Sequence, residues 1–155
     1  MTKKQIDKAL LEGCESGDFN KVRLAINFGA DVEAKTNGGL TPLHWASANN
    51  AIEIAKLLIE KGADVGAKDE WEKTPLHCAS ISNDIETTKL LIERGAEVNA
   101  KDDWGWTPLH WASYWNHIET AKLLLDAGAD LEAKDRWGNT PLDYSHTEEM
   151  KVLLK

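Results

Sequence analysis

The stretch Thr107-Pro108-Leu109-His110 decides the fold, because the chain has three copies of it and a fourth, Thr140-Pro141-Leu142-Asp143, that ends in aspartate. All four prolines of the chain lie in these copies. The copies stand 33 residues apart and begin at Thr41, Thr74, Thr107 and Thr140. A motif that returns at a constant step of this size is typical of repeat proteins, in which equivalent units stack along one axis.

A second motif keeps the same 33-residue step. Its copies are Gly29-Ala30-Asp31-Val32, Gly62-Ala63-Asp64-Val65, Gly95-Ala96-Glu97-Val98 and Gly128-Ala129-Asp130-Leu131. Two independent motifs in one register indicate that the whole chain, and not one segment of it, is built from repeats.

Each unit is predicted to form a helix, a turn, a second helix and a long loop. Threonine before proline supplies an N-cap hydroxyl, and proline at the first helical position needs no N–H partner. The second helix, as in Ile52–Ile59, carries apolar residues at three- and four-residue intervals. Residues that tolerate a left-handed backbone stand where the helices should end. They are Asn50, Asn83 and Asn116 after the first helix, and Gly62, Gly95 and Gly128 after the second.

Three motifs together resemble the ankyrin repeat: T-P-L-H-x-A, a second helix ending K-L-L, and G-A-D-V-x-A-K-D. The resemblance implies an all-α solenoid of stacked helix-turn-helix units with hairpin-like loops. It covers nearly the whole chain as one domain, residues 1–155. We expect full repeats at 36–68, 69–101 and 102–134. Residues 1–35 and 135–155 are expected to be an N-terminal cap repeat and a truncated C-terminal one, since a stack needs polar ends.

Glu72 departs from the pattern, because glycine stands at the equivalent positions 39, 105 and 138. We therefore expect the loop that contains Glu72 to be tighter or slightly strained. The last unit also departs from it, being shorter by four residues around the turn between its helices.

Charge and cysteine content narrow the classes of function. The chain has 18 Lys and Arg against 26 Asp and Glu, a formal net charge of −8. This balance argues against a nucleic-acid partner and against docking on an anionic membrane. Cys14 and Cys78 form no C-x-x-C pair, so free thiols in a reducing compartment are expected. No signal peptide or membrane span is evident. We expect a cytoplasmic monomer, although a secreted effector stays open.

The recurring His44, His77 and His110 could suggest a metal site. Neighbouring helix pairs lie ~8–10 Å apart, whereas ligands of one zinc lie within roughly 4 Å of each other. These histidines therefore cannot share an ion, and the ankyrin resemblance implies that each bonds near the Thr-Pro turn and across repeats. No nucleophile motif or phosphate-binding glycine loop is present. We expect neither an enzyme nor a cofactor.

Tryptophan is the informative residue type, with seven in the chain. Trp45 and Trp111 directly follow the T-P-L-H motif. This position is semi-buried in the ankyrin family, so the resemblance implies that both side chains pack in the core. Trp71, Trp104 and Trp137 recur at the loop tips. Trp106, Tyr114 and Trp115 do not recur. In ankyrin-like proteins the loop tips and first helices form the concave surface that meets partners.

Two interpretations of these aromatics stay open. Recurring loop tryptophans could bind a partner or staple neighbouring loops together. Non-recurring aromatics on a variable face favour a specific partner, because aromatic anchors dominate interface energetics. We therefore expect a protein or peptide partner at Trp71, Trp104, Trp106, Tyr114, Trp115 and Trp137, with Asp103 and Glu70 beside them.

Acidic residues flank this surface and favour a partner with basic side chains. They are Glu70, Glu72, Asp102 and Asp103. A methyl-lysine or cationic-peptide reader is a sharper alternative, since some ankyrin domains form an aromatic cage. A structural or engineered ankyrin scaffold without an evolved partner is the other alternative.

Asn99 lies in Glu97-Val98-Asn99-Ala100, with Leu91 eight residues before it. This arrangement resembles the ankyrin asparagine that animal dioxygenases hydroxylate. Equivalent positions hold Glu33, Gly66 and Glu132, so Asn99 is a possible modification site in one unit alone.

Overall fold

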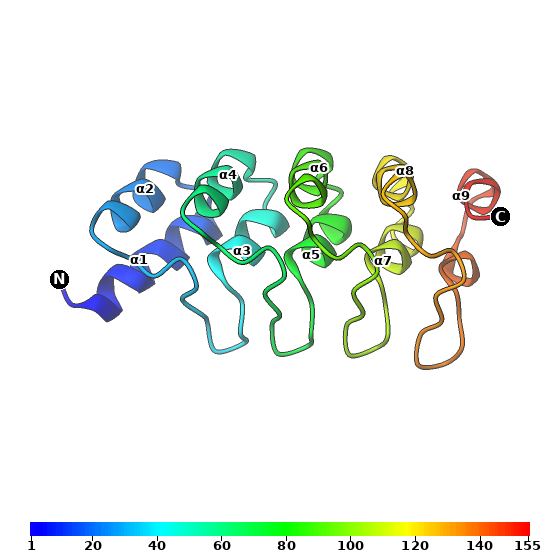
Figure 1. Cartoon of the computed structure of the whole chain (residues 1–155), viewed down its shortest axis with the longest axis horizontal. Helices are drawn as coiled ribbons and strands as arrows, with labels where there is room; N and C mark the ends of the chain where they lie inside the picture. Colours follow the sequence, from blue (N-terminus) through cyan, green and yellow to red (C-terminus); the bar gives the residue numbers. More distant parts are fainter.

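The computed structural model describes residues 1–155 and is built from helices joined by long loops, with no β-strand. Helices of one unit lie side by side, and Figure 1 shows the units in a row with the two chain ends at opposite ends of the stack. The first helix of each unit is α1 (Lys3–Ser16), α3 (Pro42–Ala48), α5 (Pro75–Ser82), α7 (Pro108–Tyr114) or the 3₁₀ helix η1 (Pro141–Tyr144). The second is α2 (Phe19–Asn27), α4 (Ile52–Glu60), α6 (Ile85–Glu93), α8 (Ile118–Asp126) or α9 (Glu148–Leu153). The predicted all-α solenoid is confirmed.

We call the first helix of each unit its inner helix and the second its outer helix. The Thr-Pro motif starts the inner helices of the full units as predicted. At α7 the Thr107 hydroxyl accepts a hydrogen bond from the backbone N–H of His110, and the His110 ring bonds back to Thr107. The same capping arrangement begins α3 and α5. The predicted left-handed positions are confirmed too: φ is 56°, 57° and 57° at Asn50, Asn83 and Asn116, and 93°, 86° and 93° at Gly62, Gly95 and Gly128.

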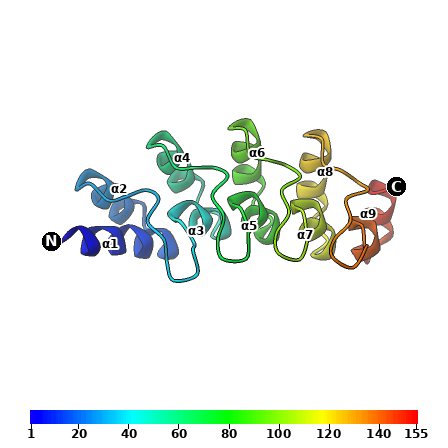
Figure 2. The ribbon, with the colours of Figure 1, turned by 60° about the horizontal axis from the view of Figure 1, so that its bottom comes forward.

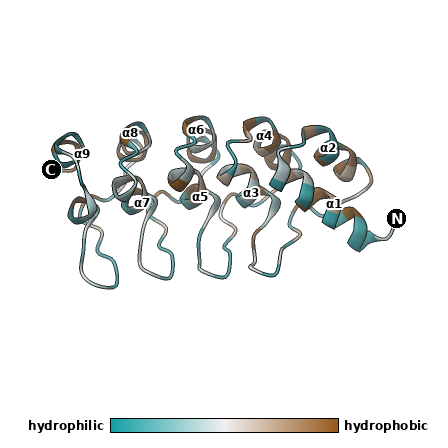
Figure 3. Cartoon of the chain, turned by 180° about the vertical axis from the view of Figure 1, so that it is seen from behind, coloured by the Kyte–Doolittle hydropathy of each residue, from teal (hydrophilic) through white to brown (hydrophobic).

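One continuous core runs along the stack between the two rows of helices. Each unit contributes leucines or isoleucines that are almost fully buried, and alanines let the helices approach closely. Figure 3 shows the hydrophobic colour on the helices and mainly pale or hydrophilic colour along the loops. Because every unit buries its apolar residues against its neighbours, the loops need not contribute to the core and their tips are available for other roles.

The long loops form hairpins that project from one side of the stack (Figure 2). Each hairpin is closed by a backbone hydrogen bond, as from Asp102 N–H to the Trp106 carbonyl at 2.9 Å. Neighbouring hairpins are also bonded to each other, as from Asp103 N–H to the Trp71 carbonyl at 3.0 Å. The hairpin tips therefore form a connected row, and side chains on successive tips come close together.

At Glu72 the backbone has the left-handed conformation that Gly39, Gly105 and Gly138 have in the other hairpins, as the expected strain requires. The φ of Glu72 is 60°, a left-handed conformation that a residue with a side chain rarely adopts. The shortened last unit is also as expected, because a single 3₁₀ turn replaces the full first helix there.

Candidate partner-binding surface

A buried aspartate organises each of the three later hairpins. Asp69, Asp102 and Asp135 are each less than a tenth exposed. One carboxylate oxygen of each accepts two backbone N–H groups, from the residues two and four positions later, at 2.9–3.0 Å. The residue two positions later is the loop tryptophan in every case. These two hydrogen bonds fix the backbone of Trp71, Trp104 and Trp137, so the rings of these residues project from rigid positions.

Trp106 was expected to be an exposed contact residue, and that prediction is wrong. Only 5% of the residue is exposed. Its indole N–H donates to the second carboxylate oxygen of Asp135 at 3.0 Å, and its ring packs against Trp111 and Tyr144 at centroid distances of 4.5 and 4.6 Å. The physical reason is that the next unit supplies both an acceptor and a covering ring, and sequence spacing alone does not show them.

Asp135 is held as a charged acceptor in this cluster. Burial opposes its ionisation, but hydrogen bonds from Tyr144, Asn139, Trp137 and Trp106 lower the pKa of the carboxyl. Burial and the contact with Asp135 raise the pKa of the Tyr144 hydroxyl, which donates to that carboxylate. Trp106 is therefore part of a rigid polar and aromatic base beneath the exposed rings.

Asp102 also lies elsewhere than expected. The sequence suggested a rim charge, but Asp102 is 7% exposed and its second carboxylate oxygen accepts the Trp111 indole N–H at 2.9 Å. Both of its carboxylate oxygens accept hydrogen bonds within the protein, so Asp102 does not present a charge at the rim. Glu70 and Asp103 are exposed as expected, and their carboxylates form no ion pair within the chain.

An open groove with an entirely aromatic lining runs between the hairpin tips and α7. Its volume is about 420 Å³. We call it the aromatic groove; its lining residues are Trp104, Trp106, Trp111, Tyr114, Trp115 and Trp137. Four of these are between 41% and 63% exposed. The structure thus brings Trp104, Tyr114, Trp115 and Trp137 together on one surface, with Trp106 and Trp111 as its floor.

Trp71 lies one hairpin away and belongs to a second aromatic arrangement. The ammonium nitrogen of Lys73 lies 5.6, 5.7 and 5.0 Å from the ring centroids of Trp71, Trp104 and Trp111. We call these three rings the tryptophan cage. At partly exposed sites each such cation–π contact is worth about 0.5–1 kcal/mol. A cavity of about 220 Å³ adjoins the cage, and Asp102 and Asp103 contribute to its lining.

Sequence reasoning raised an aromatic cage as an alternative but missed Lys73. The usable signal was its register, since Lys73 precedes Thr74 just as Trp106 precedes Thr107. It also assigned Trp111 to core packing. Trp111 is 8% exposed, as that assignment requires, yet one face of its ring closes the cage.

The repeated histidines have the structural role that was predicted. His44, His77 and His110 are fully buried. In each, Nδ1 accepts the threonine N–H, so the proton lies on Nε2, which donates to a carbonyl of the next hairpin at 2.8–3.1 Å. Burial lowers the pKa of all three rings. No group of three or more His, Cys, Asp or Glu side chains is placed to hold a metal ion.

Cys14 and Cys78 are buried and unpaired, as expected for free thiols. Burial raises the pKa of each thiol to about 12. Because the thiolate is the reactive form, neither cysteine is suited to act as a nucleophile.

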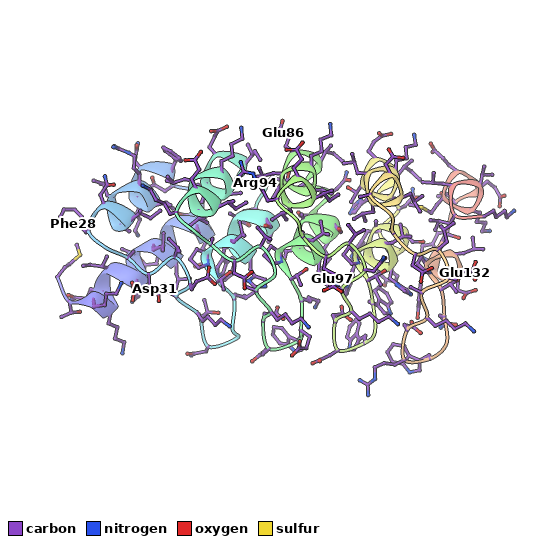
Figure 4. The ribbon with its side chains drawn as sticks, in the orientation of Figure 1. Phe28, Asp31, Glu86, Arg94, Glu97 and Glu132 are labelled. Atoms are coloured by element: carbon purple, nitrogen blue, oxygen red, sulfur yellow. The ribbon has the colours of Figure 1, made fainter.

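Asn99 is exposed, and its amide bridges two units. Its Nδ2 donates to the Gly128 carbonyl at 3.2 Å, and its Oδ1 accepts the Asp130 N–H at 2.8 Å. Glu33 accepts the Asp64 N–H in the same way two units earlier. Figure 4 places Glu97 and Glu132 on these connecting segments. The position therefore has a packing role, and hydroxylation of Asn99 stays a prediction.

A second apolar surface lies at the N-terminal end of the stack. Leu24 is 50% and Phe28 69% exposed, and Figure 4 shows Phe28 pointing away from the ribbon. No motif in the sequence marks this surface, and it was not predicted. Its lining includes one lysine and no acidic residue, in contrast with the acid-flanked hairpin face.

Comparison with known proteins agrees with the geometry. The family described as ankyrin repeats (3 copies) matches residues 2–69 and 64–135. The chain therefore belongs to the ankyrin repeat family. It is 42% identical over 50 residues to the human ankyrin repeat and SOCS box protein 16, a match that covers 32% of this chain and 11% of that protein. None of the helices is both long enough and apolar enough to cross a membrane.

Ankyrin repeats are protein–protein interaction modules, and membership of the family indicates that this chain is such a module. The family is generally non-enzymatic.

Proposed function

We propose that the chain binds an extended segment of a partner protein in the aromatic groove, with basic side chains of that segment next to Glu70 and Asp103. The observation that carries this proposal is the groove itself: four aromatic side chains, each between 41% and 63% exposed, around one hollow of about 420 Å³. Soluble monomers rarely leave a contiguous apolar patch open unless it has a function.

The groove is not a requirement of the repeat. Tyr114 is the last residue of α7 and Trp115 follows it, whereas the equivalent residues are Ala48 and Asn49 in one unit and Ile81 and Ser82 in another. The other units form the same helix pair without aromatics there. Exposed rings that stability does not demand are best explained by a ligand, and aromatic residues commonly supply the binding energy at protein interfaces.

Charge favours a basic segment. The protein has a formal net charge of −8, and the exposed carboxylates of Glu70 and Asp103 have no cationic partner within it. Asp103 lines a cavity together with Trp104, which also lines the groove, so a lysine or arginine beside an apolar anchor can meet Asp103, and one further along an extended segment can meet Glu70. We further infer a monomer that acts in a reducing compartment, where Cys14 and Cys78 stay free.

Selection from a displayed library of random peptides tests this function. We expect the enriched peptides to carry an aromatic or aliphatic anchor with lysine or arginine nearby. Trp115→Ala and Trp137→Ala should each reduce their binding by at least about 10-fold, which corresponds to about 1.4 kcal/mol. Phe28→Ala is the matched control, since it removes an equally exposed ring at the far end of the stack. Equal binding by all three variants would rule out the groove as the site.

The second candidate function is that of a scaffold whose loop tryptophans only stabilise it. The observation in its favour is that the Trp104 ring stacks on Trp111, with centroids 5.8 Å apart and planes 29° apart. On this alternative, Trp71→Ala and Trp104→Ala would lower the melting temperature by several degrees, and the library would yield no peptide that depends on Trp115.

A further inference from the structure

We propose that the tryptophan cage is a binding site for an alkylammonium group of the partner, from lysine or methylated lysine, and that Lys73 occupies this site in the free protein. The proposal rests on the proposed function, because it places one basic side chain of the partner segment. It goes beyond that function in assigning a pocket, a ligand class and an internal competitor.

The cage is assembled from three separate elements. Trp71 and Trp104 stand at the tips of successive hairpins, and Trp111 belongs to α7. Their rings converge on one point, because a single nitrogen lies 5.0–5.7 Å from all three centroids. Aromatic faces within about 6 Å of a cation form the arrangement that recognises alkylated ammonium groups. Trp71 and Trp104 remain 49% and 47% exposed, so the site is open to a ligand from outside.

Lys73 is held in the cage by the rings alone. Its ammonium group makes no ion pair within 4.0 Å and donates no hydrogen bond to the protein. Asp102, a buried carboxylate that lines the adjoining cavity, is already bonded to two backbone N–H groups and to the Trp111 indole. A side chain held this weakly on a flexible stem is replaceable by a ligand of the same charge.

The surroundings favour such an exchange. The cavity beside the cage has a volume of about 220 Å³ and is bordered by the exposed, unpaired carboxylate of Asp103. When Lys73 swings out to solvent, Asp103 can pair with it or with the incoming cation, so no charge is left buried alone. A methylated ammonium is less strongly hydrated than a lysine ammonium and loses less on entering the cage.

The repeat pattern does not require this cluster. The residues equivalent to Lys73 are Leu40, Trp106 and Asn139, and those equivalent to Trp111 are Trp45, Cys78 and Tyr144. Only the junction between the second and third full repeats combines a lysine, two tip tryptophans and an inner-helix tryptophan. The combination is therefore specific to one place in the stack.

Emptying the cage is the direct test. The probes are tetramethylammonium chloride and two otherwise identical short peptides, one with lysine and one with trimethyllysine, titrated against the full chain and followed by tryptophan fluorescence at constant ionic strength. We expect Lys73→Ala to bind tetramethylammonium at least about 10-fold more tightly than the unaltered protein. Lys73→Arg keeps a cation in the cage and should show no gain.

The controls separate the cage from a general charge effect. Lys122→Ala removes a lysine on α8 and should leave binding unchanged. Adding Trp71→Ala to Lys73→Ala should remove the gain. Should Lys73→Ala lose helical signal in circular dichroism, Lys73→Gln provides a second neutral variant with the same expected gain.

Each result bears on the ligand. Tighter binding of the trimethyllysine peptide identifies methylated lysine, and equal binding of both peptides identifies unmodified lysine. If neither Lys73→Ala nor Lys73→Gln binds any probe more tightly than the unaltered protein, the proposal is overturned and Lys73 is a structural part of the hairpin. Trp71 does not line the aromatic groove, so that outcome leaves the Trp115-dependent test of the proposed function intact.

Discussion

The tryptophans of this surface have different roles, depending on whether the ring is buried and its indole N–H is bonded within the protein. Trp106 and Trp111 are buried, and their indole N–H groups are bonded to Asp135 and Asp102. Trp115 and Trp137 are more than half exposed, and their indole nitrogens have no partner in the protein. The first two stabilise the platform, whereas the second two are free to contact another molecule.

The difference predicts a large loss of stability when a buried tryptophan is replaced and almost none when an exposed one is. We expect Trp106→Ala to lower the free energy of unfolding by about 3–5 kcal/mol, because it leaves a large cavity and removes the donor to Asp135. Trp115→Ala should change it by less than about 0.5 kcal/mol. Urea unfolding followed by circular dichroism measures both. A Trp106→Ala protein as stable as the unaltered one would show that the ring is not part of the packed platform.

The buried histidines make stability depend on pH. Burial lowers the pKa of His44, His77 and His110 in the folded protein, so the unfolded chain binds protons more readily near neutral pH. Stability is therefore full above the unfolded-state value of about 6.5 and falls as the pH drops through it. The slope is at most about 1.4 kcal/mol per pH unit for each histidine.

Urea unfolding at about pH 7.5 and about pH 5.5 checks this expectation. The free energy of unfolding should be lower at the acidic pH. Equal stability at both values would mean that the three rings bind protons as readily in the folded protein as in the unfolded chain, so that burial does not lower their pKa.

The position of Trp106 shows what sequence spacing cannot supply. Exposure was predicted because Trp106 does not recur and stands on the variable face, and the equivalent residues Leu40, Lys73 and Asn139 are in fact all partly exposed. The tryptophan is buried because Tyr144 and Asp135 of the next unit cover and bond it. Contacts between units depend on side-chain directions, and a repeat pattern fixes only the backbone positions from which the side chains start.

At the scale of elements, the hairpin is the unit that carries the site, and Glu72 is its strained point. Replacing Glu72 with glycine relieves a φ of 60° but removes an exposed ion pair with Lys68 and adds backbone freedom to the unfolded chain. Relief of a left-handed conformation is worth about 1–2 kcal/mol, which exceeds the opposing effects. We expect a gain of up to about 1 kcal/mol in unfolding free energy.

The reverse change at the next hairpin is the control. Gly105 has φ 75°, and a Cβ there would lie 3.0 Å from the Arg136 nitrogen and 3.1 Å from the Asp135 Cα. Gly105→Ala should therefore be destabilising. If Glu72→Gly also lowers stability in the same thermal unfolding series, the left-handed backbone at Glu72 carries no strain.

Most elements could be predicted because their determinants are local. The Thr-Pro cap, the asparagine and glycine helix ends and the 33-residue step placed the inner and outer helices of every full unit. The N-terminal cap was predicted less completely: residues 1–35 were expected to be a cap repeat, but the position of α2 (Phe19–Asn27) was not predicted. The α2 segment lacks the repeat motifs, and the signal left in the sequence for the start of this helix is its N-cap residue, Asp18.

At the scale of the whole molecule, the stack separates stability from binding. The core lies between the two rows of helices, and the hairpin tips add little to it. A row of bonded hairpins can thus vary its side chains from unit to unit without disturbing the fold. The family membership and the architecture could be predicted from three recurring motifs, whereas the aromatic groove and the tryptophan cage depend on rings that meet only when units stack.

Nuclear magnetic resonance of the indole N–H groups tests the central claim most directly. A peptide enriched from the displayed library is titrated into the ¹⁵N-labelled full chain, and the seven indole signals are assigned by single Trp→Phe variants. The account predicts saturable shifts for Trp115 and Trp137 and none for Trp45, which lies in the first full repeat. If other indole signals shift while those of Trp115 and Trp137 do not, the peptide binds outside the aromatic groove and the central claim is contradicted.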